Sequence, residues 1–64
     1  MILNISNHEF TVIERGVFYF ALPNYPNISA YELEDILAFI KYEKMYGRQT
    51  EIVCENATIL AAVN

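Results

Sequence analysis

Two short runs of β-branched and aromatic residues, joined by a glycine-containing turn, constrain the fold of this chain more than any other feature. The runs are His8–Ile13 and Val17–Leu22, and Glu14-Arg15-Gly16 separates them. Val, Ile, Thr, Phe and Tyr favour strands, and glycine readily adopts the positive φ that a tight hairpin turn needs. The pattern therefore predicts a β-hairpin.

Apolar side chains occupy consecutive positions of this hairpin, so both of its faces are predicted to be apolar. We expect Glu14 to pair with Val17, and this register sets the side chains on each face. One face then carries Phe10, Val12, Tyr19 and Ala21, and the other carries Thr11, Ile13, Phe18 and Phe20. Because a single helix covers only one face of a sheet, the other face remains for a partner.

Segments on either side of the hairpin predict further strands. Ile2–Ile5 predicts a short first strand, with Ser6-Asn7 as the turn into the hairpin. Pro23–Asn27 ends the sheet, because its prolines remove backbone donors and fix φ. Glu51–Glu55 alternates between polar and apolar residues, as a half-buried strand does.

The last element, residues 58–63, is open to two interpretations. Asn56-Ala57 could turn the chain into a final strand, Thr58–Val63, and we favour this interpretation slightly. The alanines of the segment fit a short terminal helix capped by Asn56 almost as well.

One α-helix is predicted over residues 30–46. Ser29 and Glu32 form the Ser-x-x-Glu pattern of a capping box at its start, and Gly47 is a typical stop at its end. Acidic residues lie near its beginning and basic residues near its end, which is the placement that the helix dipole favours. The predicted order of elements is then β-β-β-α-β-β.

At about 100° per residue, this helix has two apolar sides. The aliphatic side, expected to pack on the sheet, consists of Ala30, Leu33, Ile36, Leu37 and Ile40. The opposite side consists of Tyr31, Ala38, Phe39, Tyr42, Met45 and Tyr46. A helix side that faces solvent is normally polar, whereas Tyr, Phe and Met are enriched at protein interfaces. We therefore expect a partner there; the alternative is that Tyr31 and Tyr46 fold back over the sheet edge and leave isolated exposed aromatics.

The predicted fold is a single α+β domain over residues 1–64, with a small antiparallel β-sheet of four to five strands and one α-helix packed on one face. A chain this short buries only about 60% of its unfolded surface, and such domains commonly rely on a disulfide, a metal or a partner chain. Cys54 is the only cysteine and His8 the only histidine, so the chain has neither an internal disulfide nor zinc-ligand spacing. A partner chain is the stabiliser that remains.

No sequence motif indicates catalysis, a cofactor or a metal site. His8 and Glu9 are neighbours in a strand and point to opposite faces, so they cannot share a proton as a general base pair. Cys54 belongs to the inward-facing series of its strand, which predicts a buried, unreactive thiol. We therefore expect a protein that is not an enzyme and holds no cofactor.

The basic residues allow a second interpretation. Lys41, Lys44 and Arg48 gather at the end of the helix beside tyrosines, and could hold a small anion or a nucleotide in an oligomer that sequesters it. A solvated last turn explains the same residues more simply. The net charge of −4, with only four basic residues, argues against binding to duplex nucleic acid. A third interpretation is an acidic nucleic-acid mimic that inhibits a DNA-binding protein.

The first prediction for function is a small interaction protein: a homodimer, or an inhibitor or adaptor that docks on a larger protein. The candidate contact residues are Tyr31, Phe39, Tyr42, Met45, Tyr46, Phe10, Val12, Val17 and Tyr19. No basic signal region and no apolar run of membrane-spanning length are present, which predicts a cytoplasmic protein without a membrane partner. Acidic chains of this size are often regulators in bacteria or phages.

Overall fold

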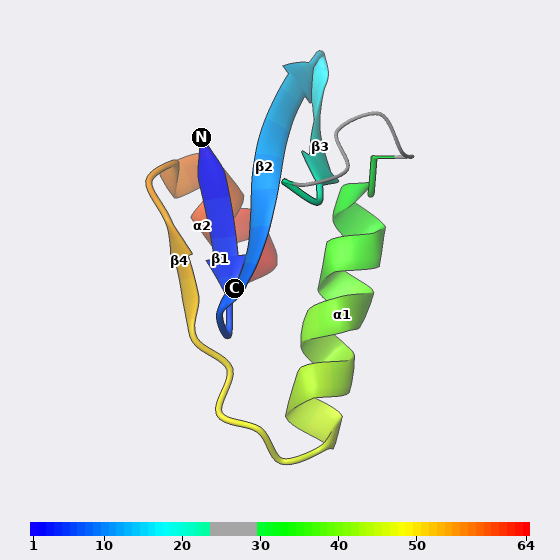
Figure 1. The fold of residues 1–64 in the computed structure, drawn as a ribbon, viewed down its shortest axis with the longest axis vertical. Helices are drawn as coiled ribbons and strands as arrows, with labels where there is room; N and C mark the ends of the chain where they lie inside the picture. The colour runs from blue at the N-terminus through cyan, green and yellow to red at the C-terminus, as the bar shows by residue number, and fades with distance from the viewer. Residues whose placement is uncertain (24–29) are drawn as a thin grey trace.

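The computed structural model describes residues 1–23 and 30–64, and it confirms an α+β fold with a four-stranded antiparallel sheet. Its elements are β1 (Ile2–Ile5), β2 (His8–Arg15), β3 (Val17–Ala21), α1 (Leu33–Met45), β4 (Ile52–Cys54) and α2 (Ala57–Val63) (Figure 1). The strands lie side by side in the order β3-β2-β1-β4. The order along the chain is thus β-β-β-α-β-α, with a helix where the sequence predicts a final strand.

The turn between β1 and β2 is the predicted one. Ser6 and Asn7 have φ angles of 48° and 70°, and Ile5 lies opposite His8 in the ladder. Positive φ at both central residues is the geometry of the favoured two-residue hairpin turn. The Asn4 side-chain oxygen accepts a hydrogen bond of 3.1 Å from the Asn7 backbone N–H, which holds the turn from one side.

The turn between β2 and β3 differs by one residue from the predicted register. Gly16 has the expected positive φ, 77°, and the residues on either side of it, Arg15 and Val17, lie opposite each other. A two-residue turn at Arg15-Gly16 would need positive φ at both positions, and Arg15 does not adopt it. The turn therefore centres on Gly16 alone, and Val12 lies opposite Phe20.

This shift sorts the apolar side chains of the hairpin onto different faces. The predicted pairing of Val12 with Tyr19 is wrong, because these two side chains lie on opposite faces of the sheet. The inner face carries Leu3, Ile5, Phe10, Val12, Phe18 and Phe20, and the outer face carries Thr11, Ile13, Tyr19 and Ala21. All three phenylalanines of the hairpin are consequently directed to the same side of the sheet.

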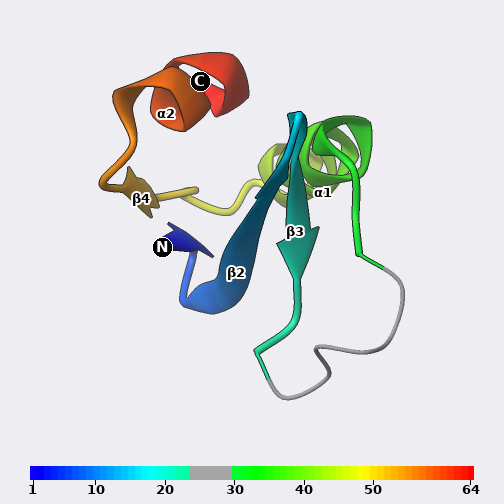
Figure 2. The same cartoon turned by 90° about the horizontal axis from the view of Figure 1, so that it is seen from above.

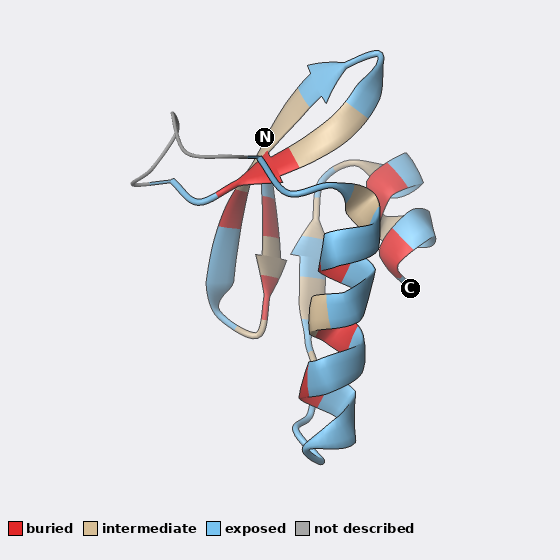
Figure 3. Cartoon of the chain, turned by 90° about the vertical axis from the view of Figure 1, so that its right-hand side faces the viewer, coloured by how far each residue is buried: buried red, intermediate tan, exposed pale blue. Residues whose placement is uncertain are grey.

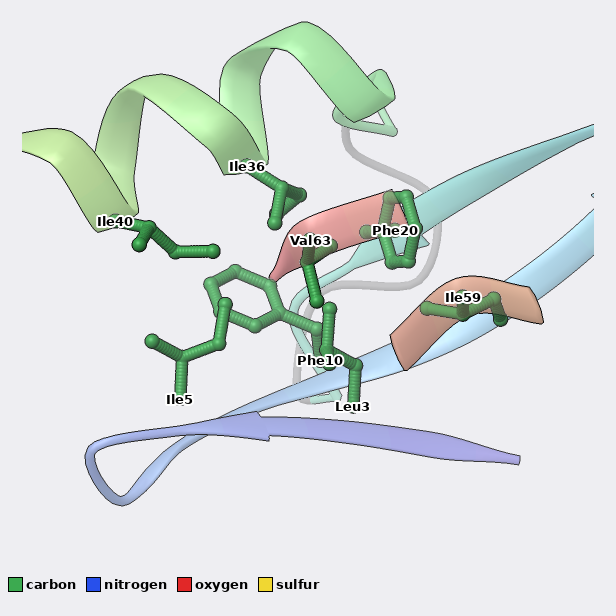
Figure 4. Close-up of a cluster of buried hydrophobic side chains, with 8 residues drawn as sticks. All are labelled: Leu3, Ile5, Phe10, Phe20, Ile36, Ile40, Ile59 and Val63. Atoms are coloured by element: carbon green, nitrogen blue, oxygen red, sulfur yellow. The ribbon is translucent and has the colours of Figure 1, made fainter. Parts of the chain in front are cut away.

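Both helices pack on the inner face of the sheet (Figure 2). The buried core joins three strands to both helices (Figure 4), and it consists of Leu3, Ile5, Phe10, Phe20, Ile36, Ile40, Ile59 and Val63. Neither helix lies on the outer face. Among the described residues, no helix combines the length and the apolarity that crossing a membrane requires.

The helix α1 begins later than the sequence predicts. Its N-cap is Glu32, whose backbone N–H donates to an Asp35 carboxylate oxygen at 3.0 Å in a capping box. The predicted cap, Ser29, lies outside the described residues. Tyr31 is not helical, because its backbone N–H and C=O bond to those of Phe20 at 2.6 and 2.8 Å beside the edge of β3. This pairing with the sheet replaces the first helical turn expected at residues 30–32.

The end of α1 follows the prediction that Gly47 stops the helix. Gly47 has a φ of 73°, and its N–H donates to the Lys44 carbonyl oxygen at 3.0 Å. The Arg48 N–H donates to the Glu43 carbonyl oxygen at 3.2 Å. These two bonds form a Schellman motif, in which the left-handed residue is ordinarily glycine.

The side of α1 that faces the sheet is only partly the predicted one. Ile36 and Ile40 are buried as predicted, and Leu33 is half-buried. Leu37 is instead 41% exposed, and Glu43 is 5% exposed. Burial therefore follows positions 33, 36, 40 and 43, and most of the remaining helix surface is exposed (Figure 3). The reason is that α2 shares the inner face, so Leu37 borders a groove between the two helices instead of the sheet.

The last element is the terminal helix α2, so the preference for a strand over residues 58–63 is wrong. The Asn56 side chain caps it by accepting a hydrogen bond of 3.1 Å from the Ile59 N–H. Ile59 and Val63, four residues apart, are the buried residues of this helix. This spacing places both on one side of a helix, and it completes the core above β1.

Candidate functional site

A groove whose lining includes four Phe and Tyr rings runs between α1 and the start of β2, with a volume of about 700 Å³. We call it the aromatic groove. Its lining residues are Asn7, His8, Glu9, Phe10, Leu22, Pro23, Tyr31, Asp35, Ile36, Ala38, Phe39 and Tyr42. The volume falls in the range typical of ligand pockets, about 300–1,000 Å³.

Three rings of the aromatic groove meet nearly at right angles. The Phe10 ring is edge-to-face with Tyr31, at 6.3 Å between centroids and 90° between planes. Phe39 stands against the same ring at 6.0 Å and 74°. Phe10 belongs to the core and is only 6% exposed, whereas Tyr31 and Phe39 come from segments that the core leaves more accessible. The buried Phe10 ring at the base of the groove thus holds the rings of Tyr31 and Phe39, which come from other parts of the chain.

A buried carboxylate, Glu43, lies behind one end of the groove. Arg48 donates to it through Nη1, with 3.0 Å to Oε2. The His8 Nε2 atom lies 3.8 Å from Oε1, and the His8 ring packs edge-to-face on Phe39 at 5.2 Å. Burial of an unpaired carboxylate is costly, so the Arg48 guanidinium compensates for the position of Glu43 in the sheet-facing side of α1. Sequence reasoning missed this residue, although its position three residues after Ile40 continues the buried series of the helix.

Three of the predicted contact residues, at the end of α1, are exposed. Tyr42, Met45 and Tyr46 have exposed fractions of 60%, 69% and 75%. Tyr42 also lines the aromatic groove, together with the half-buried Phe39. Tyr31 reaches the same groove from outside the helix, because it pairs with the edge of β3. The structure therefore brings Tyr31, Phe39 and Tyr42 together.

Other predicted contact residues lie elsewhere. Phe10 belongs to the core and is only 6% exposed, and what remains accessible of it lines the base of the aromatic groove. Val12 is half-buried and packs against the same core. Both assignments follow from the predicted register, which places these side chains on the face of Tyr19. Val17 and Tyr19 do lie on the outer face, the first exposed and the second half-buried.

The outer face of the sheet forms a second surface, which we call the open sheet face. Its apolar side chains are Ile2, Ile13, Val17, Tyr19 and Val53. They come from all four strands, and Ile2, Val17 and Val53 are exposed. Sequence reasoning predicted a second apolar sheet face but did not place Ile2 or Val53 on it.

A third concave region, of about 710 Å³, lies between α1, α2 and β3. Its apolar lining includes Phe18, Leu33, Leu37, Ile59 and Ala62. Sequence reasoning missed this groove because it arises where the two helices diverge, and only one helix is predicted. The sequence signal for this groove is Leu37, an apolar residue next to the buried residue Ile36 that the sheet does not cover.

The three basic residues of the alternative interpretation are not brought into one cavity. Arg48 is held by Glu43, and its guanidinium carbon lies 5.8 Å from the centre of the Tyr46 ring. Lys41 and Lys44 line a separate pocket of about 430 Å³, which Arg48 does not line. This arrangement gives no specific support to an anion or nucleotide site.

The groups available for catalysis are sparse in the described ranges. The acid nearest to His8 is Glu43 instead of Glu9, and 3.8 Å is longer than a hydrogen bond. Among the described residues that line the aromatic groove, none is a Ser, Thr, Cys or Lys that could act as a nucleophile. Cys54 is half-buried against the core. Within residues 1–23 and 30–64, no three acidic, His or Cys side chains are grouped as a metal site would need.

Comparison of the chain with protein-family models, with curated proteins and with solved structures finds no significant match.

Proposed function

We propose that this chain is a non-catalytic interaction protein, an inhibitor or adaptor that docks on a larger protein through the outer side of α1. The observation that supports the proposal is the exposure of Tyr42, Met45 and Tyr46 at the end of α1, where Tyr42 also lines the aromatic groove. Side chains of these types bury a large area with little loss of rotamer freedom. A helix that only faces solvent carries polar residues on its outer side.

Affinity capture with matched baits tests this docking. Wild-type protein, Tyr42→Glu and Glu34→Gln are immobilised and exposed to a lysate of the cells that encode the chain. We expect at least one protein to bind the wild type and Glu34→Gln and to be lost from Tyr42→Glu, because a charge at an interface centre is strongly unfavourable. Tyr42 and Glu34 are both exposed, so neither change disturbs the core. The proposal is contradicted if every captured protein binds Tyr42→Glu as well as it binds the wild type.

We also propose that two copies of the chain associate through the open sheet face. The specific support is that both helices occupy the inner face, while Ile2, Val17 and Val53 remain exposed on the outer one. A two-fold axis would stack the same apolar surface against itself, as in most homodimers. Sheets pack face to face in this way in β-sandwiches.

Sedimentation at micromolar concentrations tests this association. We expect the wild type to sediment at twice the chain mass of 7.4 kDa, and Val53→Glu to sediment at the chain mass because the variant puts a charge in the contact. Met45→Glu is the matched control, since Met45 is also exposed but lies on α1, away from this face. A wild type that sediments at 7.4 kDa throughout the range rejects the homodimer, and the docking surface on α1 is independent of that result.

A further inference from the structure

We propose that the aromatic groove binds a cationic side chain, lysine or arginine, that projects from the partner protein. This inference rests on the docking proposed above and names the chemistry of the group that is recognised. The groove combines aromatic rings, which attract organic cations, with the carboxylate of Asp35. The residues that carry the argument are Phe10, Tyr31, Phe39, Tyr42 and Asp35.

The rings supply the first part of the attraction. An aromatic ring has a negative face, and a cation within about 6 Å of the ring centre is attracted to it. Tyr31 and Phe39 stand at 90° and 74° to Phe10, so neither ring is stacked face to face on Phe10. Tyr42 adds an exposed ring from the next turn of α1. A guanidinium or ammonium group in the groove can therefore contact more than one ring.

The charge of the lining supplies the second part. Asp35 contributes a carboxylate to the lining, and none of the described lining residues is a lysine or an arginine. The four basic residues of the chain lie elsewhere: Arg15 ends β2, Lys41 and Lys44 line another pocket, and Arg48 is held by Glu43. His8 also lines the groove, and its ring packs on Phe39. A cation is the charge that complements the Asp35 carboxylate.

The same charge disfavours a second copy of this chain as the occupant. A two-fold contact at the groove would bring Asp35 of one copy toward Asp35 of the other, and like charges across an interface are unfavourable. The volume of about 700 Å³ also exceeds what one lysine or arginine side chain fills. The neighbouring residues of the partner segment can therefore enter with it.

The test uses N-acetyl-arginine amide and its uncharged isostere N-acetyl-citrulline amide, each titrated into the protein and followed by NMR at pH 7.5. We expect the ring signals of Tyr31, Phe39 and Tyr42 to shift with the arginine probe. The dissociation constant of the citrulline probe should be higher by about fivefold or more, because it lacks the charge. Equal affinities for the two probes, or arginine-dependent shifts confined to another surface, overturn the inference.

Two pairs of variants assign the effect to the groove. Tyr42→Leu removes a ring from the lining and Tyr46→Leu removes one outside it, and only the first should weaken the arginine probe. Asp35→Asn removes the charge but keeps an oxygen that can accept from the Glu32 N–H, and Glu34→Gln is its control. Equal effects within either pair contradict the inference. Failure of the arginine probe rejects the cation site alone, whereas the docking proposal fails only if no captured protein depends on Tyr42.

Discussion

Replacing Phe20 with alanine is expected to lower the free energy of unfolding by about 3–5 kcal/mol. Phe20 is fully buried in the core that joins the strands to both helices, and loss of its ring leaves a cavity that neighbouring side chains fill only partly. Native domains are stable by only about 5–15 kcal/mol, and a chain this short belongs at the low end. Urea titration followed by circular dichroism should therefore show a variant that is largely unfolded before much denaturant is added.

Phe18→Ala is the matched control for this loss, because both phenylalanines point to the inner face of β3. Phe18 is half-buried and borders the groove between the helices. Its removal should cost about 1–2 kcal/mol, since a smaller area returns to water. Equal losses for Phe18 and Phe20 would mean that the core extends to the tip of the hairpin, against the burial pattern of β3.

Features that depend on neighbouring residues could be predicted from the sequence. The hairpin, the Ser6-Asn7 turn and the Gly47 stop are each confirmed. Each rests on a local requirement: strand-forming side chains, positive φ at a turn, or a left-handed residue after a helix. None needs information from a distant part of the chain, which is why a single sequence was sufficient.

The register of the β2–β3 hairpin shows where local reasoning stops. The segment Glu14-Arg15-Gly16 contains one glycine, and it allows a two-residue turn or a turn centred on Gly16. Arg15 would need positive φ in the first case, and for a residue with a Cβ this is unfavourable. The steric cost of positive φ at Arg15 therefore favours the turn centred on Gly16. Because side chains alternate between the two faces of a strand, a register error of one residue places the side chains of β3 on the wrong face.

The last helix depended on packing that the sequence did not reveal. The segment Ala57–Val63 fits a strand or a helix by composition, and a strand needs a neighbour to pair with. The edge strand β4 has a free side to which a final strand could pair. The segment forms α2 instead, which covers the part of the inner face that α1 leaves open. Tertiary burial of Ile59 and Val63 decides in favour of the helix.

The sequence predicted which residues of the candidate site are exposed, but it did not predict the groove that they border. Exposure of Tyr42, Met45 and Tyr46 follows from helical spacing alone. The aromatic groove could not be predicted in this way, because it joins Phe10 of β2 to Phe39 of α1 across long sequence separations. Tyr31 reaches the groove from another part of the chain as well, so the lining of the groove is also a product of the fold.

Replacing Ile36 with alanine is expected to cost about 2–5 kcal/mol. Ile36 is 1% exposed and lies in the core between α1 and the sheet. Alanine keeps the helix propensity high, so the whole loss reflects the removed side chain and the cavity it leaves. The midpoint of urea unfolding should fall while the slope stays close to that of the wild type, because the fold itself is unchanged.

The neighbouring residue makes this prediction a test of how α1 is oriented. The aliphatic pattern of the sequence assigns Leu37 to the same buried side as Ile36, but the structure leaves Leu37 41% exposed at the groove between the helices. Leu37→Ala should therefore cost about 1 kcal/mol or less, since part of the side chain is already in water. If Leu37→Ala costs as much as Ile36→Ala, the groove between the helices is closed in solution. If the free energy of unfolding of Ile36→Ala stays within about 0.5 kcal/mol of the wild-type value, α1 packs another side on the sheet. The side that carries Tyr42 would then be the buried one.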